Sequence, residues 1–302
     1  MIKKIIFRLK HNVKNFGFLN ALKQEFCPKI SKKHYDLFVL KYLKKQVGEV
    51  IKRYQNTDPV LSPAENIIWF FWAQGEECMP VLVRRCYESV KRNAGNYKVI
   101  LISEQTISHY VQMPELVNYK KEKCLIGFAH YSDILRLLLL KAYGGIWLDA
   151  TIYVSSKIDN DINNYQFYTS SPLKRAKESI SKGKWTTYFL ASNCKNSFLI
   201  NCIYEMLITY WKKNDAAIDY LLFDYIIHLA YISNSKIKDI IDNVPENNVN
   251  IKFLSNNINE RFDKSLWDKI AKDTFLHKLS YKKKIIDDAN TFYNCLVTRS
   301  DN

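Results

Sequence analysis

The sequence has 302 residues, of which 47% are apolar, and it includes 20 Tyr, 16 Phe and 6 Trp. A chain of this length and composition can bury a sizeable core, which excludes an intrinsically disordered protein. Its formal charge is +15, and residues 1–53 carry +11 of it, so the rest of the chain carries only +4. Because the basic residues gather at one end and no nucleic-acid-binding motif accompanies them, we expect no nucleic-acid partner. The charge instead predicts an N-terminal segment that faces an anionic membrane surface.

The N-terminal 25 residues place apolar side chains at spacings of three and four, with Lys and Arg between them. This spacing predicts an amphipathic helix. The helix either lies in the membrane interface or packs its apolar stripe on the protein with its lysines in water. A further helix is expected over residues 36–54. After it, Asn56–Pro59 and Ser62-Pro63 break the chain, which predicts a boundary near residue 60.

No stretch of the sequence has the length of a membrane-spanning helix or the apolar core of a signal peptide. The seven cysteines show no CxxC pair of the zinc type. Together these features predict a protein that stays in the reducing cytoplasm.

Alternation of strand and helix patterns predicts an α/β fold. Residues 67–72 form a continuous apolar run typical of a buried parallel strand. A helix from Pro80 to about Asn93 and a strand from Tyr97 to Ile102 complete a parallel crossover. Further along the chain we expect helices at 197–213 and 219–231, a strand at 189–191, and two strands at 249–253 and 275–279 that close the sheet.

The segment from Ser132 to Tyr143 is apolar nearly all round, which predicts a buried helix. Gly144-Gly145 ends it, because glycine adopts the left-handed conformation that a helix C-terminus often needs. A strand then follows, and Asp149 lies near its end. Ligands of open α/β sheets bind at the carboxyl ends of the strands, so Asp149 is a candidate ligand-binding group. Without that context, an Asp after a strand is more often a turn residue or a helix cap.

Asp133 and Arg136 share one face of this apolar helix. Burying either charge without a partner would be costly, so both need partners. One interpretation is a buried ion pair that ties the helix to the sheet. The other is that Asp133 binds a ribose or sugar hydroxyl while Arg136 orients it or faces a polar ligand group.

The segments His130–Arg136 and Tyr143–Thr151 together resemble the donor-site signature of sugar transferases with an Asp-x-Asp motif. More narrowly, they resemble capsular polysaccharide synthesis proteins of glycosyltransferase family thirty-two, and the resemblance runs from about Asn66 to Leu279. It implies an A-type glycosyltransferase fold, which is Rossmann-like with a mostly parallel central sheet, here with a helical N-terminal extension. It also implies a nucleotide-sugar donor such as a UDP-sugar, Mn²⁺ or Mg²⁺, and retention of the anomeric configuration.

The resemblance assigns donor-binding roles to six residues. These are Trp72, Asp133, Arg136, Gly145, Asp149 and Lys278. Within this set, Trp72 would pack against the base, and Lys278 would neutralise charge on the leaving diphosphate. Asp149 would also be catalytic, as the first position of the motif.

The metal site departs from the family pattern at Thr151, which stands where the motif has its second, metal-binding Asp. A hydroxyl is a weaker ligand than a carboxylate, so the metal is held weakly or by additional groups. The expected ligands are Asp149, Thr151 and His277. Outside the resemblance, a His-Lys pair such as His277-Lys278 is more often a surface feature.

Residues for the acceptor are less specific. Asp224 and His228 share a helix face, where they either position an acceptor hydroxyl, with Asp224 in a catalytic role, or form a solvated face. A group of aromatic residues either forms an acceptor wall or belongs to the core: Tyr165, Phe167, Tyr168, Trp185 and Tyr188.

The resulting expectation is a basic helical, membrane-associating region at residues 1–60 and a catalytic domain at 61–302. The enzyme would transfer a sugar to a capsular or lipopolysaccharide-type surface glycan, or to a lipid-linked glycan, at the inner face of a bacterial plasma membrane. The alternative is a non-catalytic sugar- or nucleotide-binding scaffold of a polysaccharide assembly complex, which Thr151 favours. Slow donor hydrolysis without acceptor distinguishes an active transferase from a scaffold.

Overall fold

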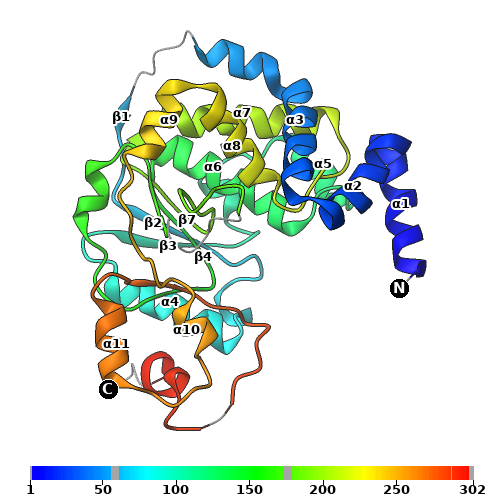
Figure 1. Ribbon diagram of the computed structural model, residues 1–302. Helices are drawn as coiled ribbons and strands as arrows, with labels where there is room; N and C mark the ends of the chain where they lie inside the picture. The colour runs from blue at the N-terminus through cyan, green and yellow to red at the C-terminus, as the bar shows by residue number, and fades with distance from the viewer. Residues whose placement is uncertain (1, 56–60, 173–178, 287, 299–302) are drawn as a thin grey trace. The chain divides into compact units, whose positions relative to one another are not determined.

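The computed structural model describes residues 2–55, 61–172, 179–286 and 288–298 (Figure 1). The chain divides into two compact units. Unit 1 comprises residues 1–59, 113–138 and 198–239, and unit 2 comprises residues 60–112, 139–197 and 240–302. Each unit therefore combines segments that are far apart in the sequence. The domain division near residue 60 stays a prediction, and the expected break at Asn56–Pro59 lies outside the described residues.

In the described residues of unit 1, the regular secondary structure is helical. Its helices are α1 (Ile2–Phe16), α2 (Phe18–Ile30), α3 (Lys32–Gln55), α5 (Glu115–Glu122), α7 (Phe198–Lys213) and α8 (Leu222–Ser233). Helices α6 (Phe128–Tyr143) and α9 (Ser235–Asp242) begin in unit 1 and end in unit 2. Of all the helices described, none is long and apolar enough to cross a lipid bilayer.

The predicted N-terminal helix is in fact two helices, α1 and α2. Gly17 separates them with a φ of +78°, a conformation that glycine adopts without steric cost. The two helices are joined through the buried carboxylate of Glu25, which accepts from Arg8 of α1 at 3.1 Å and from Lys29 at 2.7 Å. The break turns one predicted amphipathic stripe into a pair of packed helices.

Helix α3 forms the centre of unit 1 because its apolar residues recur every four positions. Tyr35, Val39, Leu43 and Val47 are all buried and therefore make one continuous stripe along the helix. The stripe ends at Tyr54, whose ring lies 5.4 Å from that of Phe198 at the start of α7. Helix α3 is thus an integral part of this unit's core.

Unit 2 is built around a sheet. Its strands are β1 (Ser62–Pro63), β2 (Ile67–Phe71), β3 (Lys98–Ile102), β4 (Gly145–Asp149), β5 (Ile152–Val154), β6 (Tyr168–Thr169), β7 (Phe189–Ser192), β8 (Cys194–Lys195) and β9 (Leu276–Lys278). Its helices are α4 (Val81–Asn93), α10 (Phe253–Asn256) and α11 (Lys264–Ala271), with 3₁₀ turns at Glu76–Cys78, Ile107–His109 and Asn160–Asn164 and a π-helical segment at Tyr293–Thr298.

The central sheet of the described chain has five strands in the order β3-β2-β4-β7-β6. Strand β2 runs parallel to both β3 and β4, and helix α4 makes the predicted crossover along one side of the sheet (Figure 1). The packing of α4 is illustrated by Tyr87, whose ring lies 5.0 Å from that of Phe70. Strand β7 runs antiparallel to β4 and to β6, so the sheet is mixed and not mostly parallel as predicted. The α/β class is confirmed.

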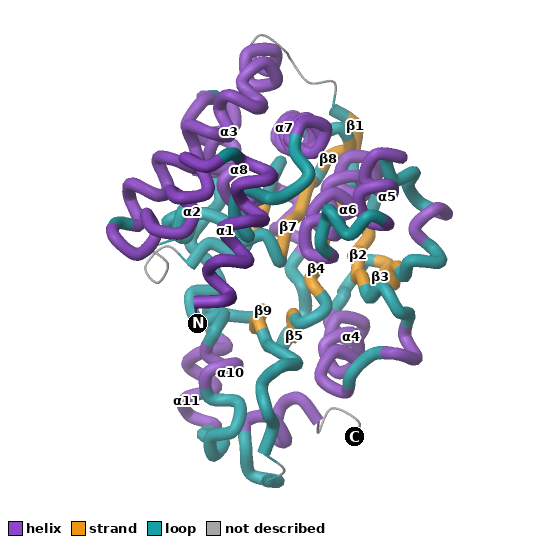
Figure 2. The backbone as a smooth tube through the Cα atoms, turned by 90° about the vertical axis from the view of Figure 1, so that its right-hand side faces the viewer, coloured by secondary structure: helices purple, strands orange, loops and turns teal. Residues whose placement is uncertain are grey.

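The expectation that residues 249–253 and 275–279 close this sheet is wrong. Residues 249–252 form turns, because Asn248 has a φ of +48° and its side-chain oxygen accepts from the backbone N–H groups of Phe275 and Leu276. Strand β9 does form, but it pairs antiparallel with β5 in a separate two-stranded sheet (Figure 2). Strand pattern alone did not specify which partner β9 would take.

Gly144 and Gly145 end α6 as predicted, and both have positive φ values, +68° and +82°. A Cβ on Gly145 would lie 2.4 Å from the carbonyl oxygen of Ile67. The glycine therefore lets β4 start directly beside β2, and this close approach is what brings the rest of β4 into register.

Replacing Gly145 with Ala is expected to lower the free energy of unfolding more than the same change at Gly75. Gly75 also has a positive φ, +84°, but open space around its Cβ position. Gly75→Ala should cost about 1–3 kcal/mol of backbone strain. Gly145→Ala should cost about 1–3 kcal/mol more, because it also overpacks against backbone. Urea unfolding of the two variants measures the difference; equal losses would contradict a steric role for Gly145.

Candidate functional site

Asp149 is the last residue of β4, where the predicted ligand-binding edge of the sheet lies. Its Oδ1 atom accepts a hydrogen bond from Trp147 Nε1 at 3.0 Å, and its Oδ2 atom lies 3.0 Å from Lys278 Nζ. Trp147 stands two residues earlier in the strand, so the two side chains share a face of the sheet. The indole orients the carboxylate, and about a quarter of the Asp149 side chain (27%) stays exposed to a ligand.

Lys278 comes from β9, far along the sequence, and reaches Asp149 because β9 pairs with β5 just after β4. Its ammonium also lies 5.1 Å from the ring centroid of Tyr188, a cation–π arrangement. The backbone oxygen of Tyr188 in turn accepts from the backbone N–H of Asp149 at 2.9 Å. The structure thus brings together two predicted donor-site residues, Asp149 and Lys278, as a partly exposed ion pair.

Trp72 follows β2 and is held by two hydrogen bonds. Its backbone N–H donates to Ile102 at 3.0 Å, and its indole N–H donates to the carbonyl oxygen of Cys78 at 3.2 Å. The ring of Tyr281 meets it edge-on, with centroids 6.0 Å apart. The predicted base-packing residue is therefore one half of an aromatic pair at the end of β2.

Three residues that contact Asp149, Lys278 or Trp72 were not predicted to do so: Trp147, Tyr188 and Tyr281. Trp147 had a usable signal, because its spacing of two from Asp149 in a strand places both on one face. Tyr188 and Tyr281 had none in the sequence, since their positions depend on which strands and loops pair.

His277 precedes Lys278 in β9, so its side chain points to the opposite face of that strand from Lys278. It is fully buried, with its ring 4.9 Å from that of Trp267 and its Nε2 atom 3.2 Å from Ser155 Oγ. Burial lowers the pKa of His277 to about 3, so the imidazole is neutral at physiological pH. The geometry gives no support to His277 as a ligand of a metal held by Asp149.

The remaining predicted metal ligands are Asp149 and Thr151, which lies in the turn between β4 and β5. Among the described residues, no three His, Cys, Asp or Glu side chains gather in a way that could hold a metal. One partly exposed carboxylate, with a hydroxyl residue two positions later in the chain, suits a hard cation that takes most of its ligands from diphosphate and water. The residues present fit that mode of binding.

Unit 1 holds the second predicted group, on α6. Asp133 Oδ1 lies 3.1 Å from Arg136 Nη2, and Asp133 Oδ2 lies 3.5 Å from His130 Nδ1. The guanidinium of Arg136 also stands over the ring of Phe223 at 5.6 Å. The two charges therefore pair with each other within α6, and the 13% exposure of the Asp133 side chain leaves little of it open to solvent.

Asp224 and His228 lie on α8 with half-buried side chains, one turn apart. The ring of His228 stacks on that of Tyr231, with centroids 6.3 Å apart. Among the aromatic residues weighed as an acceptor wall, Phe167, Tyr168 and Trp185 are buried and belong to the core. The structure leaves Tyr165 and Tyr188 partly exposed.

Comparison with known proteins finds similarity over most of the chain. Residues 20–296 match the family model described as Capsular polysaccharide synthesis protein. The chain is 31% identical to O-glycosyltransferase braB of Annulohypoxylon truncatum over 121 residues, or 37% of this chain and 28% of that protein. It is 24% identical to Glycosyltransferase afumC of Aspergillus fumigatus over 175 residues, or 55% of this chain and 44% of that protein. The chain thus spans less than half the length of these two relatives.

Among solved structures, one titled PaToxG Glycosyltransferase aligns with 81% of this chain and 99% of its own length. The sequence identity is 14% and the TM-score is 0.42.

Proposed function

Because the chain belongs to the capsular polysaccharide synthesis protein family, we propose that it is a glycosyltransferase that uses a nucleotide-sugar donor. The observation that carries the proposal is the partly exposed Asp149–Lys278 pair at the carboxyl end of β4, the edge where open α/β sheets bind ligands. The names of the two similar fungal proteins support the same class of enzyme. The proposed acceptor is a surface polysaccharide or a lipid-linked glycan, and the proposed donor is a UDP-sugar.

An A-type glycosyltransferase fold is part of this proposal. It is supported by the parallel order β3-β2-β4, by the crossover helix α4, and by the position of Asp149 after β4. The antiparallel strands β7 and β6 extend this parallel core.

The proposed roles follow from the chemistry of each side chain. Asp149 accepts hydrogen bonds from donor hydroxyls, and Trp72 offers a ring face or edge for the base. When the bond between the anomeric carbon and the diphosphate breaks, negative charge grows on the diphosphate oxygens, and the Lys278 ammonium stabilises it. The acceptor hydroxyl oxygen forms the new bond to the anomeric carbon and gives its proton to the departing diphosphate, in a reaction proposed to retain the anomeric configuration. Asp224 is proposed to position that hydroxyl.

Asp133 and Arg136 are proposed to contact the nucleotide or the donor sugar. Both side chains of this ion pair are nearly buried. Burial supports the proposal because it strengthens the electrostatic interaction of both groups with a bound ligand. In this proposal Arg136 orients the Asp133 carboxylate through their ion pair.

We also propose that Mn²⁺ or Mg²⁺ binds together with the donor, with Asp149 and Thr151 as the protein's contribution. A divalent cation would supply positive charge to the diphosphate in addition to that of Lys278. Thr151 in place of a carboxylate is the one feature that favours the alternative function, a non-catalytic scaffold that binds sugar or nucleotide.

The enzyme is proposed to work as a peripheral protein at the inner face of the plasma membrane. Helices α1 and α2 support this placement because they expose large apolar side chains within the most basic part of the sequence. These exposed residues are Ile6, Phe7, Val13, Phe18, Leu19, Phe26 and Ile30. An interfacial helix needs this combination of apolar and cationic side chains.

Calorimetric titration of nucleoside diphosphates, UDP first, tests the donor proposal. We expect one nucleotide to bind, more tightly with Mn²⁺ than without it. Asp133→Asn should weaken that binding by about tenfold, since it replaces a charged acceptor with a neutral one. The matched control is Asp215→Asn. Asp215 is the carboxylate partner of Lys120, another buried cation of unit 1.

The control variant should bind like the wild type. Equal weakening in both variants would mean that Asp133 acts only through the stability of the unit. Binding without donor hydrolysis would favour the scaffold function, and binding of no nucleotide would contradict the donor proposal itself. Thr151→Asp should increase the gain in nucleotide affinity that Mn²⁺ causes. If Mn²⁺ changes the nucleotide affinity of neither the wild type nor Thr151→Asp, that result would contradict a metal at this position.

A further inference from the structure

The loop between α7 and α8, residues 214–221, presents a strongly exposed aromatic side chain. Tyr220 in this loop is 78% exposed. Its ring centroid lies 6.2 Å from that of His130 on α6, and the ring of His130 lies 5.7 Å from that of Trp211 on α7. The three rings form a series from the surface to the core, and Tyr220 is its outer member.

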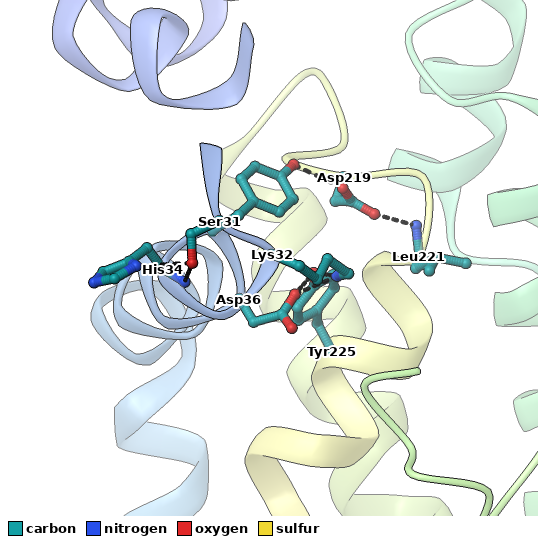
Figure 3. Close-up of polar contacts among 8 residues, drawn as sticks. Ser31, Lys32, His34, Asp36, Asp219, Leu221 and Tyr225 are labelled. Atoms are coloured by element: carbon teal, nitrogen blue, oxygen red, sulfur yellow. Dashed lines mark hydrogen bonds and ion pairs between the residues drawn. The ribbon is translucent and has the colours of Figure 1, made fainter. Parts of the chain in front are cut away.

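Hydrogen bonds fix the backbone on both sides of Tyr220. Asp219 Oδ1 accepts from the backbone N–H of Leu221 at 2.7 Å (Figure 3). Asp219 Oδ2 accepts from the Tyr35 hydroxyl, also at 2.7 Å. The carbonyl oxygen of Ile218 accepts from Gln24 Nε2 at 2.8 Å. Side chains of α2 and α3 therefore hold this loop.

The base of the loop is held in the same way. The Tyr210 hydroxyl donates to the carbonyl oxygen of Ala216 at 2.7 Å and accepts from the N–H of Ile218 at 2.8 Å. At the start of the loop, the Tyr42 hydroxyl of α3 donates to Asn214 Oδ1 at 2.6 Å. The side chains of Gln24, Tyr35, Tyr42 and Tyr210 that anchor the loop are buried or half-buried, so the loop has little freedom to move without breaking several hydrogen bonds.

The first turn of α3 is locked to α8 next to this loop. Tyr225 donates to Asp36 and accepts from Lys32 Nζ at 3.0 Å, while Lys32 and Asp36 form an ion pair (Figure 3). Burial raises the pKa of both Tyr35 and Tyr225, with further contributions from their carboxylate partners Asp219 and Asp36. Both hydroxyls therefore stay protonated and keep donating throughout the physiological range.

A rigid loop that holds a large ring in solvent is preorganised for binding, because the entropy cost of ordering it has already been met in folding. The polar groups behind the ring favour a neutral ligand that carries hydroxyls. The charge of Asp133 is balanced by Arg136, and His130 beside it can exchange hydrogen bonds. The N–H group of Trp211 is buried and has no hydrogen-bond partner among the described residues.

We propose that Tyr220 is a binding platform for a pyranose ring of the acceptor glycan, with Asp219 and Tyr35 as the residues that position it. The C–H face of a pyranose packs on an aromatic face, and its hydroxyls then reach the polar groups beside the ring. A polymer must approach from solvent, which matches the exposure of Tyr220, whereas the Asp133 side chain is only 13% exposed. The inference rests on the proposed function, since it supplies the acceptor for that transfer.

The test begins with the full chain on an array of surface polysaccharide fragments, followed by calorimetry with the fragment that binds best. Tyr220→Ala should raise its Kd by about tenfold or more, as expected for loss of one stacking contact. Tyr220→Phe keeps the ring and should stay close to the wild type. The matched control is Tyr119→Ala, which removes another exposed tyrosine of unit 1, on α5, and should have no effect.

The positioning role is tested with Tyr35→Phe, which removes the hydroxyl that holds Asp219. It should weaken glycan binding while leaving UDP binding unchanged. Tyr54→Phe is the control, because it removes a comparable hydrogen bond from the same helix to Glu205 of α7, away from the loop. A purely structural effect would lower stability in both variants without separating glycan from UDP affinity.

Three results would overturn the inference. The first is that the wild type binds no fragment, and the second is that Tyr220→Ala binds the glycan like the wild type. The third is that Tyr220→Ala lowers the affinity for UDP as much as the affinity for the glycan. Each of these is distinct from failure of the proposed function, which would appear as an absence of nucleotide binding and donor hydrolysis in the wild type.

Discussion

Replacement of Asp149 by Asn is expected to lower donor hydrolysis and sugar transfer by about a thousandfold, the scale found when one preorganised polar group is lost from an active site. Asparagine keeps the size of the side chain and can still accept from Trp147. It loses the charge that holds Lys278 at 3.0 Å and replaces one acceptor oxygen with a donor. The measurement is the initial rate of UDP release from the donor that calorimetry identifies.

The matched control for this variant is Asp242→Asn. Asp242 forms an ion pair with Lys184 at 2.6 Å in the same unit, with a side chain 28% exposed against 27% for Asp149. Both pairs are partly exposed, so each substitution should cost at most about 1 kcal/mol of stability. Only Asp149→Asn should lose activity.

Lys278→Met and the double variant separate the two partners. If Asp149 and Lys278 act as a unit, the double variant should be about as impaired as the worse single variant, because effects within a catalytic unit do not add. Full activity of Asp149→Asn would remove Asp149 from the site and leave the strand-end argument without support.

Membrane attachment is expected to depend on the exposed apolar residues of α1 and α2. The wild type should sediment with vesicles rich in phosphatidylglycerol and not with pure phosphatidylcholine, because residues 1–53 carry a net charge of +11. The double variant Phe7→Glu, Leu19→Glu should bind at least about a hundredfold more weakly. The two side chains are 74% and 71% exposed, so their insertion is worth about 1.5–3 kcal/mol each without disturbing the core.

The control is Ile232→Glu on α8, which places one glutamate at another exposed apolar side chain of unit 1. It should leave vesicle binding intact. Raising the salt concentration should weaken binding of the wild type, since exposed charges are screened. Unchanged sedimentation of the double variant would contradict the interfacial role of these helices and favour the simpler interpretation of a solvated basic face.

Point substitutions are preferable here to removal of the N-terminal segment. Glu25 is buried between α1 and α2, and Gln24 donates a hydrogen bond to the loop that carries Tyr220. Deleting this segment would therefore disturb unit 1 as well as membrane contact, and the two effects could not be separated.

Local sequence pattern correctly predicted the elements that depend on short-range physics. The apolar run of β2, the crossover to β3 and the glycine stop after α6 all require only residues within a few turns of one another. The resemblance predicted family membership, which the match over residues 20–296 confirms. The same local reasoning failed at Gly17, because it followed the apolar spacing through a residue that ends the helix.

The pairing of Asp149 with Lys278 shows where prediction from the sequence ended. The resemblance selected both residues for the donor site, but 129 positions separate them, and only the pairing of β9 with β5 places one against the other. The same pairing turns His277 to the other face of β9, where burial makes it neutral. A one-residue shift in that register would exchange the two side chains.

The sequence by itself determined the class of the fold, the buried helix α6, the strand that ends in Asp149 and the concentration of charge in the first 53 residues. These properties follow from periodicity, chain stiffness and composition, which are local. Only the tertiary structure decided that the sheet is mixed, that β9 pairs with β5, and that α2 and α3 hold the loop of Tyr220. Such long-range contacts depend on which surfaces bury one another in the folded chain, and no local pattern specifies that choice.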